Sequence, residues 1–163
     1  VLANNNAADS KNSQAKASSA WRAISAATGE LVAPGTTGTL KYDASAAGTT
    51  GSHGSPVLSD AVSNRNGEAG SDENATGSTS GPLEAITTKA GLVVPSIAKA
   101  LSLFPLGANL GGDLLYLRNY GERLAISGGG WDNGAAAGVF ALNLYGARST
   151  RGPTLGARPA FVL

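Results

Sequence analysis

The sequence predicts a mixed α+β domain with small antiparallel sheets, one or two short helices and long irregular loops. Glycine supplies 23 of the 163 residues and charged side chains only 14%, a composition that disfavours long helices because glycine is costly inside them. Apolar residues come in short runs separated by Gly, Pro, Ser, Thr and Asn, as in short strands joined by turns. The best helical pattern is a single segment, residues 95–104.

The chain divides into a polar start and one domain. Residues 1–18 are of low complexity and carry too little apolar surface to offset the entropy of ordering, so we expect a tether or assembly segment there. Residues 19–163 are long enough for one domain with a core.

Seven short strands and one helix are predicted within this domain. The strands are Trp21–Ile24, Leu31–Val32, Thr39–Tyr42, Leu114–Arg118, Arg123–Ser127, Gly138–Leu144 and Ala157–Leu163. The helix is Pro95–Phe104, with proline in the first turn and Ile97, Leu101 and Phe104 on one face, packed against the sheet. Residues 44–81 are rich in Gly, Ser, Thr, Asn and Asp and are predicted to form a long loop.

Composition argues against several classes of function. The formal net charge is +1 and no basic run occurs, which disfavours a nucleic-acid partner because such binding needs clustered cations. Cysteine is absent, so disulfides and thiolate chemistry are excluded. No apolar run is long enough to insert into a membrane.

No motif of a catalytic or metal site is present, so we predict neither an enzyme nor a cofactor. His53 is the single histidine, and a triad would have to combine it with Ser52 or Ser55 and Asp43 or Asp60. An exposed loop histidine is the favoured interpretation, because nothing preorganises a base. We interpret Asp72-Glu73 as solvated side chains rather than a calcium site.

The last third of the chain carries signals at fixed places. They are Gly128-Gly129-Gly130-Trp131, Phe140-Ala141-Leu142-Asn143-Leu144, Ala147-Arg148-Ser149 and Gly156-Ala157-Arg158-Pro159-Ala160. This pattern resembles the variable proteins of diversity-generating retroelements, of the type borne by phages and similar to phage tropism determinants. Upstream, Trp21-Arg22-Ala23, residues 63–67 and residues 114–123 resemble the phage-borne branch less specifically. Ser127 departs from the pattern, which commonly has arginine before the glycines.

The resemblance implies a C-type lectin-like fold that displays exchangeable residues within 128–160. In this family the slots come from template asparagine codons altered at adenines. Here the slots, taken as ligand-binding residues, hold Gly130, Asp132, Asn133, Ala136, Tyr145, Gly146, Thr150, Gly152, Pro153 and Thr154, with Arg151 at a serine-codon slot. Tyr145 and Arg151 are expected to point outward on one face, because Tyr and Arg most often anchor protein contacts.

A display surface needs a scaffold specified by other residues. Trp131, Phe140, Leu142 and Leu144 are therefore expected to be buried, and exposure of both Trp131 and Phe140 would overturn the prediction of a lectin-like fold. Arg148 and Arg158 are expected to tie loop carbonyls together. Trp131-Asp132-Asn133 is superficially similar to a lectin calcium motif in altered order, and we expect ligand binding to need no metal.

The function that the resemblance implies is recognition of a protein or glycan receptor on a host or neighbouring cell. The chain would then belong to a phage tail fibre or tip, or to a cell surface, and contact other virion tail proteins. Small side chains in the slots favour modest affinity strengthened by avidity, so we expect a homo-oligomer, possibly a trimer. Two alternatives are a structural fibre or decoration protein, and a relative of formylglycine-generating enzymes that has lost catalysis.

Overall fold

The computed structural model describes most of the residues between 22 and 146 and confirms a mixed α+β fold. The described residues are 3–4, 22–33, 36–48, 50–66, 76–120, 122–123, 125–146, 152–153 and 155. The strands in this part are β1 (Ala3–Asn4), β2 (Ala23–Ile24), β3 (Leu31–Val32), β4 (Lys41–Ala44), β5 (Thr50–Ser52), β6 (Pro56–Ser59), β7 (Thr76–Pro82), β8 (Thr87–Thr88), β9 (Leu114–Leu117), β10 (Glu122–Arg123), β11 (Ile126–Ser127) and β12 (Leu142–Leu144). The helical elements are α2 (Ser96–Ala100) and the 3₁₀ turns η1 (Leu83–Ala85) and η2 (Gly134–Ala136).

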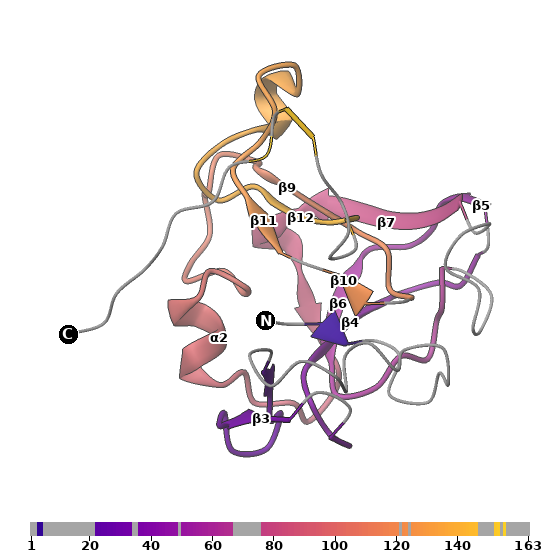
Figure 1. Ribbon diagram of the computed structural model, residues 1–163, viewed down its shortest axis with the longest axis vertical. Coiled ribbons are helices and arrows are strands. Elements are labelled where there is room, and N and C mark those ends of the chain that lie inside the picture. The colour runs from indigo at the N-terminus through magenta and orange to yellow at the C-terminus, as the bar shows by residue number, and fades with distance from the viewer. Residues whose placement is uncertain are drawn as a thin grey trace.

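The largest sheet has the strand order β11-β12-β9-β7-β5 and crosses the upper part of the molecule (Figure 1). It is mixed, because β12 runs parallel to β9 and β5 parallel to β7, whereas β11/β12 and β7/β9 are antiparallel. Smaller sheets pair β4-β6-β8, β2-β3 and β1-β10. The prediction of small antiparallel sheets is therefore correct for β1-β10 and β2-β3 and wrong for the two larger sheets, which also contain parallel pairs.

The core lies against one face of this sheet. Leu142 and Leu144 on β12 are register partners of Leu115 and Leu117 on β9, and all four are buried. Alternate residues of a strand point to opposite faces, so these four leucines share the inner face. They join one cluster with Ile24, Leu40, Tyr42, Leu58, Leu83, Ile86, Ala98 and Leu103.

The helix is shorter than predicted. After Ala100 the chain reverses through Ser102, whose φ is 55°. The amide of Ser102 donates to the carbonyl of Lys99, and that of Leu103 to the carbonyl of Ala98, the pattern of a Schellman motif. The reversal places Leu103 in the core and leaves Leu101 exposed. The predicted apolar face is correct for Ile97 and Phe104, which are partly buried against the core, and wrong for Leu101.

The predicted loop 44–81 contains strands β5 and β6 and most of β7. Strand β7 reads Thr-Gly-Ser-Thr-Ser-Gly-Pro and has no apolar alternation, yet it lies inside the sheet between β9 and β5. Backbone pairing and buried hydroxyls hold it in place of apolar packing. Residues 67–75, including Asp72-Glu73, lie outside the described residues.

A buried polar network joins these strands to the rest of the domain. Asn66, Thr79 and Asn119 are fully buried. The Asn119 side chain accepts a hydrogen bond from the Asn66 amide and donates one to the Asn64 carbonyl, both at 2.6 Å. Asn66 Nδ2 donates to Thr79 Oγ1 at 2.8 Å. Asp43 accepts hydrogen bonds from the amides of residues 63 and 64. Each satisfied group avoids the cost of a buried, unpaired polar atom.

The remaining strand predictions fare unevenly. Leu31–Val32 and the run beginning at Leu114 form strands as predicted, whereas Arg123–Ser127 is divided between β10 and β11. Of Trp21–Ile24, the structure shows a strand at Ala23–Ile24, and the third predicted strand begins at Lys41 rather than Thr39. Residues 157–163 and most of 1–18 lie outside the described residues.

Candidate functional site

The candidate site lies on the outer face of the five-stranded sheet. Asn143 is exposed between the buried Leu142 and Leu144, so its side chain points away from the core. Its register partners are Tyr116 on β9 and Ile126 on β11, both of which are half-buried. Because register partners in neighbouring strands share a face, three side chains from three strands form a row across the sheet.

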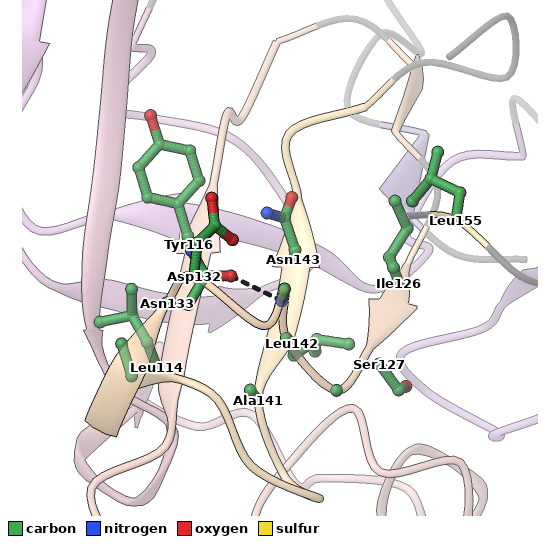
Figure 2. Close-up of a pocket in the computed structure, with 14 residues that line it drawn as sticks. Leu114, Tyr116, Ile126, Ser127, Asp132, Asn133, Ala141, Leu142, Asn143 and Leu155 are labelled. Atoms are coloured by element: carbon green, nitrogen blue, oxygen red, sulfur yellow. Dashed lines mark hydrogen bonds between the residues drawn. The ribbon is translucent and has the colours of Figure 1, made fainter. Parts of the chain in front are cut away.

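A hollow of about 460 Å³ opens over this row. Strands β9, β11 and β12 form its floor and the segment 128–136 forms a wall. Its lining residues are Leu114, Tyr116, Ile126, Ser127, Gly128, Gly129, Gly130, Asp132, Asn133, Ala136, Ala141, Leu142, Asn143 and Leu155. Figure 2 shows Tyr116, Asp132 and Asn143 gathered at one end, with Ile126 and Leu155 at the other. The volume is in the range of small-molecule and side-chain pockets.

The turn that forms the wall is closed by Asn133. Its Oδ1 atom accepts a hydrogen bond from the Gly130 amide at 2.7 Å (Figure 2), and its own amide donates to the Gly130 carbonyl at 3.0 Å. An asparagine that hydrogen-bonds the nearby backbone stabilises such a turn. Asp132 is exposed, and in the described part of the chain no hydrogen bond or ion pair holds its carboxylate.

The far end of this segment is anchored by Asp113. The buried Asp113 accepts a hydrogen bond from the Phe140 amide at 2.9 Å. Gly138 packs so closely on the same carboxylate that an added Cβ would lie 2.2 Å from Asp113 Oδ1. Residues 138–140 therefore form a turn, and the strand predicted from Gly138 begins only at Leu142.

The backbone of Tyr145 is held by hydrogen bonds to the side chains of two other residues. Its amide donates to Asn143 Oδ1 at 2.8 Å, and its carbonyl accepts from Arg123 Nη1 at 3.1 Å. The Arg118 guanidinium carbon lies 4.0 Å from the centre of the Tyr145 ring, and the Tyr116 ring centre lies 5.8 Å away. The backbone at position 145 is thus fixed by contacts that do not require tyrosine there.

The cationic stack continues inward from Tyr145. Arg118 also faces the ring of the buried Tyr120 at 5.9 Å, and Arg123 lies 4.7 Å from the same ring. Burial raises the pKa of the Tyr120 hydroxyl, an effect that the two guanidinium groups oppose. Arg118 therefore lies between the buried Tyr120 and the exposed Tyr145, where cation–π attraction to both rings orders it.

Hydrogen exchange at residue 145 tests this arrangement. We expect Tyr145→Ala to leave protection of the residue 145 amide unchanged, because Asn143 Oδ1 still accepts its hydrogen bond. Asn143→Ala removes the acceptor and should speed exchange by about fivefold, the equivalent of ~1 kcal/mol. Equal loss of protection in both variants would show that the tyrosine side chain itself fixes the backbone.

The structure brings several sequence-predicted site residues to the hollow. Gly130, Asp132, Asn133 and Ala136 line it. Tyr145 is exposed beside Tyr116.

The other predicted site residues lie apart from this group or outside the description. Gly146 is buried, whereas Gly152 and Pro153 are exposed. Thr150, Arg151 and Thr154 lie outside the described residues, as do Arg148 and Arg158.

Sequence reasoning missed the floor of the hollow. Tyr116, Ile126 and Asn143 were assigned only to strands, although each lies on the outer face. The signal that could have found Asn143 is its position between two leucines, because alternation in a half-buried strand places the polar residue outward. Arg118 gave no such signal, since its stacking depends on Tyr145 in a distant segment.

Two of the four predicted core anchors are exposed. Trp131 is 89% exposed and Phe140 39%, whereas Leu142 and Leu144 are buried as predicted. The physical reason lies in the two anchors of the wall, because Asn133 closes the turn around Trp131 and Asp113 holds the Phe140 amide. Polar contacts fix this segment, so its large apolar side chains need not enter the core.

Replacement of Trp131 with alanine should therefore leave stability nearly unchanged. An exposed side chain loses little packing on truncation, and we expect a change within ~0.5 kcal/mol. Thermal melts of Trp131→Ala and, as a buried control, Leu144→Ala give the comparison. Leu144→Ala should cost about 2–5 kcal/mol; a cost of that size at Trp131 would mean that the indole packs inside the domain.

The serine-histidine arrangement considered from the sequence is not assembled. His53 is half-buried, packs against Gly48, and its Nε2 contacts the Thr50 carbonyl. Asp43 binds backbone amides, and Asp60 forms an ion pair with Lys89 at 2.6 Å. Both carboxylates thus have other partners.

The described residues contain neither a metal-binding cluster nor a membrane-spanning helix. They contain no group of three His, Cys, Asp or Glu side chains placed to hold a metal ion. They also contain no helix of the length and hydrophobicity needed to cross a membrane.

Comparison with known proteins adds no relative. No protein-family model matches the chain, and no curated protein matches it.

Proposed function

We propose that this chain is a receptor-binding protein that displays an exchangeable surface on a mixed α+β scaffold. The observation that carries the proposal is that several residues assigned to exchangeable slots are exposed, whereas two residues assigned to the scaffold are buried. Asp132, Asn133 and Tyr145, which the motif resemblance assigns to exchangeable slots, are exposed around one face of the sheet. Leu142 and Leu144, which it assigns to the scaffold, are buried beneath that face.

Two further features support display on a fixed frame. The backbone of residue 145 is held by Asn143 and Arg123, so its side chain can change without moving the chain. The hollow supplies a concave surface beside it. The exposure of both Trp131 and Phe140 meets the condition set against the lectin-like fold, so the proposal rests on the sheet face and not on that fold.

Selection from a displayed library tests this function. Positions 132, 133, 136 and 145 are randomised, and clones are selected on a purified protein such as hen lysozyme. A control library randomises the exposed residues Ala90, Val93, Leu106 and Ala108, none of which lines the hollow. We expect specific binders from the first library and few from the second. Equal yields, or none from the first, would contradict the proposal.

Receptor recognition by a phage fibre would further require several copies of the chain. We propose a homo-oligomer, with a trimer as the expected form, because avidity compensates for small side chains such as Ala136 and Gly152. Light scattering coupled to size-exclusion chromatography measures the mass directly. A monomer at micromolar concentration would contradict this part of the proposal.

A further inference from the structure

The hollow over the sheet combines an apolar floor with one charged group. Leu114 and Ile126, both half-buried on the outer face, supply apolar surface at the floor. Among the described residues that line it, Asp132 alone has a charged side chain. Asn133 accepts the Gly130 amide, and in the described residues the Asp132 carboxylate, although one of its oxygens lies close to Gly130, accepts no hydrogen bond.

An aromatic ring and an amide stand at the same end as this carboxylate. Tyr116 and Asn143 are register partners on adjacent strands, and Figure 2 shows both gathered with Asp132. The Asn143 oxygen accepts the Tyr145 amide. The Arg118 guanidinium is stacked on Tyr145 and does not line the hollow. No other Lys or Arg among the described residues lines it either, so the lining provides no cationic partner for the carboxylate.

We propose that the hollow receives an arginine side chain of a protein ligand, with the guanidinium at Asp132 and Tyr116. This inference rests on the proposed function and names the chemistry that the face recognises. The methylene stem of arginine suits the apolar floor. Its planar head can pair with a carboxylate through two hydrogen bonds and stack on an aromatic ring, which an ammonium group does less well.

Titration with amino-acid derivatives tests the proposal directly. The probes are the Nα-acetyl methylamides of arginine, lysine, norleucine and glutamate, added to the isotope-labelled chain. Nuclear magnetic resonance follows the amides of residues 128–133 and 143. We expect saturable shifts with the arginine derivative and about tenfold weaker binding of the norleucine derivative, as a charge-assisted contact would give. Raising the salt concentration should weaken only the binding of the cationic probes.

Asp132→Asn provides the matched variant, because it removes the charge with little change of shape. It should abolish the preference for arginine over norleucine, whereas Asp60→Asn, which alters a carboxylate outside the hollow, should preserve it. The proposal fails if the arginine derivative gives no saturable shift, if lysine, norleucine or glutamate binds as tightly, or if Asp132→Asn keeps the preference. Failure here with binders recovered from the display library would overturn this inference alone. Failure of the library would overturn the proposed function.

Discussion

Gly77→Ala is expected to cost about 3 kcal/mol of stability or more, a large share of the ~5–15 kcal/mol that keeps an ordinary domain folded. A Cβ at position 77 would lie 1.7 Å from the Asn66 carbonyl oxygen and 2.5 Å from that of Gly48. Both are backbone atoms and cannot swing aside. Gly77 lies in β7, where it pairs with Gly51 of β5. The clash would therefore push β7 away from the backbone at Asn66 and Gly48. Thermal unfolding followed by circular dichroism measures the effect.

Gly107→Ala is the control for this prediction. No atom lies within 4 Å of a Cβ built at Gly107, and its φ is not in the left-handed region. Its melting temperature should stay near that of the parent chain. Equal melting temperatures of the Gly77→Ala and Gly107→Ala variants would mean that the Asn66 carbonyl does not lie against Gly77 as described.

Asn119→Leu is the second substitution with a large expected effect. Leucine has the same number of side-chain heavy atoms, with the same branching, but cannot accept the Asn66 amide or donate to the Asn64 carbonyl. Two buried backbone groups then lose their partners at about 1–3 kcal/mol each, so we expect a loss of about 2–6 kcal/mol in urea unfolding.

Asn133→Leu gives the matched exposed comparison. Its side chain serves one backbone amide at the surface, and its removal should cost about 1 kcal/mol or less. A cost at Asn119 no greater than that at Asn133 would show that water, and not the network, satisfies the groups around Asn66.

The sequence predicted those elements whose apolar residues follow one clear period. The leucines of β9 and β12 were identified because each run is short, apolar and bounded by turn residues. Strand β7 could not be found in this way, because Thr79 and Ser78 are buried through hydrogen bonds and carry no apolar signal. The end of α2 was missed because Ser102 adopts a left-handed conformation that its residue type does not favour.

The sequence predicted several residues of the candidate site but not the hollow that they line. The motif resemblance directed attention to residues 130–136 and to Tyr145, and these surround one face. The hollow itself depends on residues far apart in the chain, with Tyr116 and Asn143 brought together by a parallel strand pair. Burial of Trp131 was predicted from its place among the motif's scaffold residues, whereas local polar contacts decide its position.

The central claim is that the outer face tolerates exchange of side chains while the inner face does not. The direct measurement is the folded fraction, scored by protease resistance, of two libraries of equal size. One randomises Asp132, Ala136 and Tyr145 on the outer side, and the other Leu117, Leu142 and Leu144 in the core. We predict that most clones of the first library fold and that few of the second do. Equal folded fractions, or a lower fraction in the first library, would contradict the account.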